Sequence, residues 1–304
     1  MNEAAISIQG VSKSYGRVQA LRGLDLSVQR GEIFGFLGPN GAGKTTTIRC
    51  LLDLIRPQQG EIRVMGIDPR RDPVAVRARC GYLPGELHID DNLTVEAALR
   101  FFVRLRQGQA DWKYARALTE RLDLNLGQRI KNLSKGNKQK VGLVQALMHR
   151  PEVLLLDEPT AGLDPLVQQT VMGLVVEAAQ AGATVFFSSH VLSEVQAIAG
   201  RVGIIRQGVL IEVAQTDTLL RRSVRRLRLR FAGPVDPGDL LAVPGVILLA
   251  QPAPDSLHLE VTGTMEALVK ALAAYPVQDL ETEHPSLEEV FLAYYRTEEV
   301  REEK

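Results

Sequence analysis

Hydrophobic positions divide the chain into stretches of different periodicity. In the first thirty residues apolar and polar side chains alternate, which predicts strands with one buried face. The inward positions of these strands are Ile6, Ile8, Leu24, Leu26 and Val28. Uninterrupted apolar runs at 33–37, 153–156 and 184–187 are typical of strands buried on both faces. A helical stretch from Lys44 to about Leu54 follows the first run.

A second helix is predicted between the runs at 153–156 and 184–187. Asp164 provides its N-cap, Pro165 stands at its first position and Gly182 lies just beyond its end. Residues 86–150 are rich in Leu, Ala, Arg and Gln at helical spacing, which predicts a helical insertion. Because strands alternate with helices, we expect a mainly parallel α/β sheet.

The pattern changes near residue 220, and we place a domain boundary there, between 1–220 and 221–304. Strand-like pieces at about 226–232, 246–250, 256–262 and 277–283 combine with helix-like pieces at about 237–243 and 264–275. This β-α-β-β-α-β order predicts a small α+β domain of ferredoxin-like type. A last helix is predicted from Ser286, because Ser286 and Glu289 have the spacing of a capping box.

Composition narrows the classes of function. The 304 residues carry 36 Lys and Arg against 36 Asp and Glu, so net charge gives no argument for a nucleic-acid partner. Two cysteines, Cys50 and Cys80, are too few for a disulfide framework or a four-cysteine zinc site, and we expect small buried side chains in a reducing compartment. No apolar stretch reaches about 18 residues and no secretory signal begins the chain, so we expect a soluble, cytoplasmic protein.

Residues 38–45 carry a phosphate-binding motif. Their sequence, GPNGAGKT, fits G-x-x-x-x-G-K-[ST] and lies between a predicted strand and a predicted helix. The glycines let successive backbone N–H groups point at phosphate oxygens, and the helix N-terminus favours an anion. Lys44 brings a positive charge to the β- and γ-phosphates, and the Thr45 hydroxyl is suited to bind Mg²⁺. The motif therefore predicts a nucleotide site.

A pair of carboxylates ends the apolar run at 153–156. A parallel strand delivers its last residues to the crevice beside the phosphate loop. We expect Asp157 to hold Mg²⁺, directly or through water, and Glu158 to orient or deprotonate the attacking water. Buried strands often end in acids, so the pair is informative only together with the phosphate loop.

Further segments resemble the ATP-binding domains of ABC transporters. Residues 133–137 (LSKGN) resemble the family's signature motif, and 157–164 (DEPTAGLD) resemble its Walker B motif and D-loop. Residues 189–190 (SH) resemble the switch-histidine segment, and Tyr15 resembles the aromatic residue that stacks on adenine. The elements follow family order over 1–220. The resemblance implies an ABC-type P-loop NTPase with a mixed sheet, an N-terminal antiparallel β subdomain and a helical insertion.

The resemblance also implies ATP and Mg²⁺ as cofactors and a head-to-tail pair of subunits. ATP on one phosphate loop is covered by the signature motif of the other copy, at a helix N-terminus that favours a γ-phosphate. The implied catalytic residues are Lys44, Glu158 and His190, of which His190 makes a hydrogen bond to the γ-phosphate. The implied metal-binding residues are Thr45 and Asp157. The residues implied in nucleotide binding are Tyr15, Gly38, Asn40, Gly41, Ala42, Gly43, Lys44, Thr45, Thr46, Ser134, Gly136, Asn137 and Asp164.

Three positions depart from the family's pattern. Lys135 stands where the signature usually has glycine, and Asn137 where it has glutamine. Lys135 either adds charge near phosphate or faces solvent, and we favour solvent. The Q-loop glutamine falls at Gly85, which has no side chain to reach Mg²⁺ or water. Glu86 is a candidate substitute, but it comes one residue late.

Two features bear on the work that ATP hydrolysis drives. Residues 94–102 form an amphipathic stretch with Thr94 as N-cap, in the region that receives the coupling helices of the membrane subunit in the family. For Phe101 and Phe102 we favour packing inside the insertion itself. Residues 285–295 (PSLEEVFLAYY) resemble the end of ATP-binding subunits of ABC-2-type exporters, the branch that includes antibiotic and multidrug efflux systems.

That second resemblance implies the motor subunit of an exporter, which hydrolyses ATP to drive efflux of a small, drug-like molecule. Its implied partners are a separate integral membrane permease and a second copy of the chain, with no nucleic acid. Its implied place is the cytoplasmic face of the cell membrane, where it is held through the permease. The sequence does not indicate the transported substrate.

Residues 221–230 form the one charge run. We favour an edge strand with Leu227, Leu229 and Phe231 inward and the arginines in water, because the alternation is regular. Contact with anionic lipid headgroups or with an acidic partner surface is the alternative.

Two other functions compete with the exporter. A soluble ABC ATPase that acts on DNA or ribosomes is disfavoured, because the chain has no long coiled-coil insertion, a single phosphate loop and no net charge. A regulator that binds ATP but scarcely hydrolyses it is disfavoured by Glu158 and His190 and favoured by the changed Q-loop.

Overall fold

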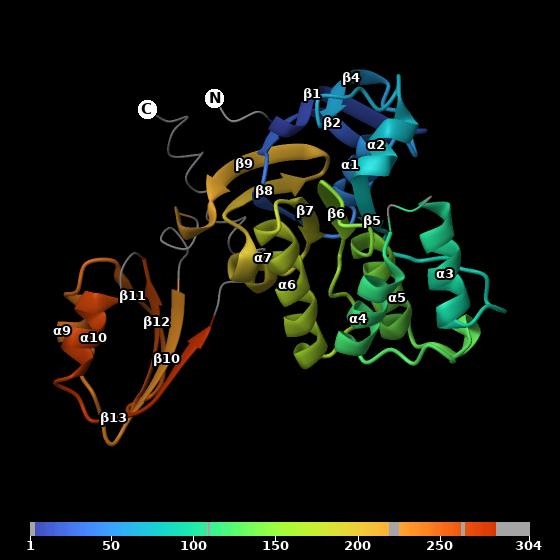
Figure 1. Cartoon of the computed structure of the whole chain (residues 1–304). Coiled ribbons are helices and arrows are strands. Elements are labelled where there is room, and N and C mark those ends of the chain that lie inside the picture. Colours follow the sequence, from blue (N-terminus) through green and yellow to red (C-terminus); the bar gives the residue numbers. More distant parts are fainter. Residues whose placement is uncertain (1–3, 107, 109, 219–224, 263–264, 284–304) are drawn as a thin grey trace. The chain divides into compact units, whose positions relative to one another are not determined.

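The computed structural model describes residues 4–106, 108, 110–218, 225–262 and 265–283. The chain divides into two compact units, Met1–Gln215 and Thr216–Lys304 (Figure 1). The helix expected from Ser286 and the exporter-like segment 285–295 lie outside the described residues. Within those residues, no helix has the length and apolar character needed to cross a bilayer.

The first unit begins with the antiparallel sheet expected from the alternating pattern. Its three strands, in the order β2-β1-β4, are β1 (Ala4–Tyr15), β2 (Val18–Gln29) and β4 (Gln59–Val64). All five positions predicted to face inward are buried in the first hydrophobic core. β1 and β2 form a hairpin that turns at Gly16, where φ is +57°.

A six-stranded sheet carries the phosphate loop. Its order is β5-β6-β7-β3-β8-β9, and every neighbouring pair is parallel except β8 with β9. The strands are β3 (Ile33–Leu37), β5 (Cys80–Leu83), β6 (Val153–Asp157), β7 (Thr184–Ser189), β8 (Arg201–Arg206) and β9 (Val209–Gln215). β7 lies between β3 and β6, with Ser189 opposite Leu37 and Ser188 opposite Asp157. The carboxyl ends of these three strands therefore meet at one edge of the sheet.

Helices α1 (Lys44–Leu51), α2 (Pro73–Arg79), α6 (Pro165–Gln180) and α7 (Leu192–Ile198) connect the strands. α6 begins as predicted, because the Asp164 carboxylate accepts a 3.1 Å hydrogen bond from the Val167 N–H. α1 ends earlier than predicted, since Asp53 adopts a left-handed φ of +50° that the helix cannot continue through. α7 packs closely on β3 at Gly35, where a Cβ would lie 2.5 Å from Cγ1 of Val195.

The helical insertion comprises α3 (Val95–Leu105), α4 (Trp112–Arg121), the 3₁₀ turn η1 (Ile130–Asn132) and α5 (Lys135–Leu147). Thr94 caps α3 as predicted and accepts a hydrogen bond from the Ala97 N–H. The interpretation of Phe101 as a core residue is wrong, because its side chain is 52% exposed. The buried face of α3 holds Val95, Ala98 and Leu99, and helical geometry turns position 101 away from that face while Phe102 is half-buried.

Both cysteines are buried and free, as expected. Burial raises the pKa of Cys50 to about 11 and that of Cys80 to about 12. The Cys80 carbonyl lies 3.1 Å from Nε2 of His149, a buried side chain after α5. Nδ1 of His149 has no hydrogen-bond partner within the described residues. Burial, aided by Arg106, lowers the pKa of His149 to about 4, so the imidazole is neutral in the folded chain.

The second unit has the element order β-α-β-β-α-β. Its elements are β10 (Arg225–Phe231), α9 (Gly238–Leu241), β11 (Val246–Ala253), β12 (Ser256–Val261), α10 (Glu266–Leu272) and β13 (Val277–Glu283). The strands form an antiparallel sheet in the order β11-β12-β10-β13. Its core contains the inward residues Leu227, Leu229 and Phe231 together with side chains of both helices.

The expected edge position of the arginine-rich strand is wrong. β10 lies inside its sheet, between β12 and β13. Arg228 and Arg230 stand opposite Glu281 and Asp279 of β13. Cross-strand pairs of opposite charge allow a strand with alternate arginines to occupy an interior position.

Candidate active site

The phosphate loop connects β3 to α1 and is shaped by its glycines. Gly41 and Gly43 have φ of +80° and +113°. At Gly43 a side chain is excluded a second time, because a Cβ would lie 2.6 Å from the carbonyl oxygen of Ala20. The Gly38 N–H donates a 3.1 Å hydrogen bond to the Ser189 carbonyl of β7. The loop is thereby fixed to the strand that precedes His190.

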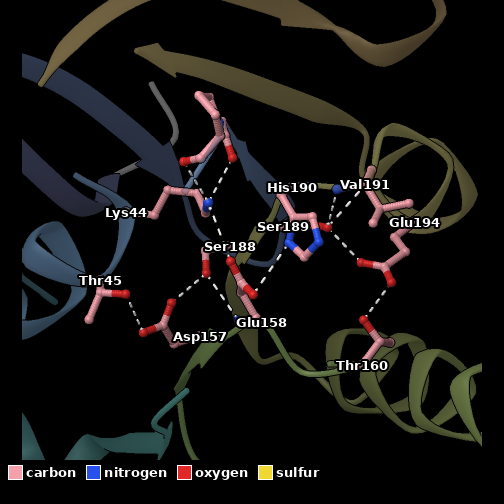
Figure 2. Close-up of polar contacts among 12 residues, drawn as sticks. Lys44, Thr45, Asp157, Glu158, Thr160, Ser188, Ser189, His190, Val191 and Glu194 are labelled. Atoms are coloured by element: carbon pink, nitrogen blue, oxygen red, sulfur yellow. Dashed lines mark hydrogen bonds and ion pairs between the residues drawn. The ribbon is translucent and has the colours of Figure 1, made fainter. Parts of the chain in front are cut away.

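Lys44 is the first residue of α1 and is only 5% exposed. Its ammonium donates hydrogen bonds to the carbonyl oxygens of Gly38 (2.7 Å) and Pro39 (3.1 Å). Nζ also lies 3.4 Å from Oε1 of Glu158 (Figure 2). The ammonium therefore lies inside the loop, where a phosphate group could replace these carbonyl oxygens as its hydrogen-bond acceptor.

Asp157 ends β6 with both carboxylate oxygens engaged. The Thr45 hydroxyl donates a 2.7 Å hydrogen bond to Oδ2, and the Ser188 hydroxyl donates one of 2.7 Å to Oδ1. Asp157 is buried, so Ser188 and Thr45 hold its side chain in one orientation. The Thr45 hydroxyl and the Asp157 carboxylate lie 2.7 Å apart, close enough to bind one ion together. Both are hard oxygen ligands of the kind that Mg²⁺ prefers, so these residues fit Mg²⁺.

Glu158 follows with a left-handed backbone, φ +50°, which is uncommon for a residue with a side chain. Its N–H donates to the carbonyl and hydroxyl oxygens of Ser188, and its carbonyl accepts a 3.0 Å hydrogen bond from the Gln139 amide. These contacts hold a conformation that would otherwise be disfavoured. The carboxylate lies between the ammonium of Lys44, which faces Oε1, and the imidazole of His190, whose Nδ1 is 3.3 Å from Oε2.

The structure adds three residues that sequence reasoning missed: Gln139, Ser188 and Glu194. Ser188 and Ser189 did carry a signal, because two hydroxyl side chains end an otherwise apolar run directly before His190. Gln139 and Glu194 had none, since polar residues are ordinary on helices.

The signature segment forms the start of α5. Ser134 is the N-cap and accepts a 3.2 Å hydrogen bond from the Asn137 N–H. At Gly136 a Cβ would lie 2.8 Å from the Gly162 carbonyl, so this turn packs directly on the backbone of the D-loop. Lys135 is exposed, as we expected for a side chain in solvent. Among the contacts of the described residues, none joins Ser134 or Asn137 to the phosphate loop.

The other predicted residues lie outside the polar cluster that the described residues form. Tyr15 is 46% exposed, and Nζ of Lys13 lies 5.3 Å from its ring centroid. Asn40 is exposed and Ala42 buried in the loop, and Thr46 is half-buried on α1. Exposure leaves Tyr15 available to a flat ligand.

Gly85 faces the metal-binding candidate. A Cβ at this position would lie 3.4 Å from Oδ2 of Asp157. Glu86, the possible substitute, is exposed. The position that carries the Q-loop glutamine in the family therefore adjoins Asp157 here but offers only backbone.

Comparison with known proteins identifies the family. A family model described as ABC transporter matches residues 21–161. The daunorubicin resistance ATP-binding protein DrrA3 of Streptomyces coeruleorubidus is 37% identical over 96% of both chains. The chain belongs to the ABC transporter family.

Further similarities cover about three quarters of the chain. The bacitracin transport ATP-binding protein BcrA of Bacillus licheniformis is 36% identical over 75% of both chains. A solved structure of the ATP-binding subunit of an ABC transporter is 29% identical and superposes with a TM-score of 0.66, over 71% of this chain and 92% of that one. The chain is accordingly an ABC-type P-loop ATPase that binds and hydrolyses ATP, and the expected fold and activity of this domain are confirmed.

Proposed function

We propose that this chain is the motor subunit of an exporter for a small, drug- or antibiotic-like molecule, with the residues of the six-stranded sheet edge in the roles expected for them. The observation that carries the proposal is the position of Glu158 between Lys44 and His190, beside the Thr45–Asp157 pair. The relatives named for daunorubicin resistance and bacitracin transport support the class of work.

The contacts of these side chains support the proposed roles. When ATP binds, Lys44 gives up its hydrogen bonds to the Gly38 and Pro39 carbonyls and donates to phosphate oxygens instead. The N–H groups of the loop bind the same phosphates. Glu158 holds a water and takes its proton, while His190 donates to the γ-phosphate. Thr45 and Asp157 would hold Mg²⁺, which neutralises charge on the β- and γ-phosphates when it is bound.

We further propose that two copies complete the site. Ser134 caps an exposed helix start that has no contact with its own phosphate loop among the described residues. Such a helix N-terminus attracts an anion. In a head-to-tail pair, Ser134, Gly136 and Asn137 of one copy would cover ATP bound by the other, with Asp164 nearby on the D-loop.

The permease contact belongs to the same proposal. Phe101 and Leu105 of α3 are exposed apolar side chains on the helical insertion. We assign them to the surface that receives an integral membrane permease at the cytoplasmic face of the membrane. We also propose the domain division at about residue 220, with a C-terminal accessory domain of ferredoxin-like type, which the sheet order β11-β12-β10-β13 supports.

One observation favours a second candidate, an ATP-binding regulator with little turnover. Gly85 brings no side chain to Asp157, where the family has glutamine. The position of the Glu158 carboxylate beside Lys44 and His190 favours the motor, because these are the groups that contact phosphate in the proposed site.

The test uses a tagged Glu158→Gln variant purified with ATP and Mg²⁺ from detergent-solubilised membranes of the native host. A polytopic membrane protein in stoichiometric amount is the expected result. Recovery from the soluble fraction alone, or with ribosomes or DNA, would overturn the exporter proposal.

A further inference from the structure

Glu194, on α7, uses both oxygens of its carboxylate to join two segments of the site. Oε2 accepts a 2.6 Å hydrogen bond from the Ser189 hydroxyl, and Oε1 accepts one of 2.5 Å from the Thr160 hydroxyl (Figure 2). The two hydroxyl residues are almost completely buried, with exposures of 1% and 3%. Buried hydroxyls require partners, and one side chain satisfies both.

These bonds close a ring through the catalytic candidates. Thr160 comes two residues after Glu158, and Ser189 directly precedes His190. The ring is completed where Oε2 of Glu158 lies 3.3 Å from Nδ1 of His190. Glu194 therefore links the neighbours of Glu158 and His190, in addition to the β6–β7 pairing and the hydrogen bonds from the Glu158 N–H to Ser188.

Ser189 transmits this constraint to the backbone on both sides of His190. Its hydroxyl accepts a 2.9 Å hydrogen bond from the Val191 N–H, and its carbonyl accepts the bond from Gly38 of the phosphate loop. The hydroxyl that Glu194 holds thus also fixes the turn that presents His190.

We propose that Glu194 is a positioning residue for ATP hydrolysis, which holds the histidine segment 189–191 and the segment 158–160 together as one unit. The inference rests on the proposed roles of Glu158 and His190. Because Thr160 leads into the D-loop, the same bridge connects the histidine to the part of the chain that would face a second copy.

The test compares Glu194→Ala with the nearly isosteric Glu194→Gln in the full chain. Loss of the bridge should lower kcat about 10- to 100-fold, as misplacement of a catalytic group does, while the dissociation constant for ATP changes little. Glu194→Gln keeps one acceptor and one donor for the hydroxyls and should recover much of kcat. Hydrogen exchange at the Val191 amide should accelerate in Glu194→Ala.

A double-mutant cycle tests the bridge itself. Thr160→Val should lower kcat and should not lower it further in the Glu194→Ala background. Additive losses from Thr160→Val and Glu194→Ala would mean that the two residues act separately, and the proposal would be wrong.

The matched control is Glu32→Ala. Glu32 also uses both oxygens, which bind Arg201 at 2.9 and 3.1 Å, but it lies at the amino ends of β3 and β8. This variant should lower the free energy of unfolding without changing kcat.

Glu158→Gln and His190→Ala distinguish a failure of the proposed roles from a failure of the Glu194 bridge. If they retain turnover, the proposed roles fail; if they abolish it while Glu194→Ala matches wild type, only the bridge fails.

Discussion

Nζ of Lys44 lies 3.4 Å from Oε1 of Glu158, so the lysine proposed to bind phosphate is also the ion-pair partner of the proposed general base. A bound phosphate would compete with Glu158 for this ammonium. Glu158→Gln removes the charge that competes for Lys44 and also removes the base. We expect turnover to fall by about 100-fold or more and ATP affinity to be retained or to rise, in single-turnover and equilibrium-binding measurements. Turnover at the wild-type rate would contradict the role of Glu158.

Gly85→Gln restores a side chain beside Asp157. A Cβ there would lie 3.4 Å from Oδ2, and the amide beyond it could donate to the oxygen that already accepts from Thr45. We expect a changed dependence of ATPase activity on Mg²⁺ concentration. Gly85→Ala is the control, because its methyl group makes only ordinary contact. Identical Mg²⁺ curves for the two variants and the wild type would mean that this position is not used.

Gly136→Ala and Gly173→Ala should have opposite effects on stability. At Gly136 the new methyl group meets the Gly162 carbonyl at 2.8 Å, so the start of α5 must move away from the D-loop at a cost of about 1–3 kcal/mol. At Gly173, inside α6, nothing lies within 4 Å, and alanine should stabilise the helix by about 0.5–1 kcal/mol. Urea unfolding of the two variants measures both signs.

His149 should make the fold sensitive to mild acid. Its pKa is lowered from 6.5 to about 4 in the folded chain, so the unfolded chain binds an extra proton between these values. The free energy of unfolding is therefore unaffected by this histidine above about pH 6.5. It falls by up to about 3 kcal/mol as the pH decreases from there toward 4. His149→Gln keeps an N–H for the Cys80 carbonyl but does not titrate. Its free energy of unfolding should fall less between pH 7 and pH 4.5, and equal slopes would contradict the assignment.

Phe101 and Leu105 should matter only in the assembled exporter. Replacing both with serine removes exposed apolar surface without disturbing the buried face of α3. ATPase activity of the isolated subunit should stay unchanged, whereas stimulation by the permease should be lost. Normal coupling in reconstituted vesicles would exclude this face as the docking surface.

Local patterns predicted what local chemistry determines. The phosphate loop was recognisable because its residues, Gly43 and Lys44 among them, are close together in the sequence. The caps at Thr94 and Asp164 were recognisable because each bonds the N–H three residues later. The apolar runs at 33–37, 153–156 and 184–187 predicted three buried strands because each is continuous over several residues.

Long-range pairing accounts for what was missed. Ser188 and Glu194 reach the site only because β7 lies between β3 and β6, and no local pattern encodes that order. The interior position of β10 depends on acids of β13 about fifty residues later. Adjacent residues of a helix lie about 100° apart around its axis, so Phe102 can border the buried face of α3 while Phe101 points to solvent, and the sequence does not say where that face ends.

The two buried thiols have a practical consequence for following the proposed pair in solution. With pKa values raised to about 11 and 12, Cys50 and Cys80 hold almost no thiolate at neutral pH and should resist maleimide reagents. The two natural cysteines therefore need not be replaced before cysteines are introduced for site-directed labelling. A spin label on cysteine at Asn40 and another at Ser134, on separate copies, would measure directly how far a signature helix travels toward a neighbour's phosphate loop when ATP arrives.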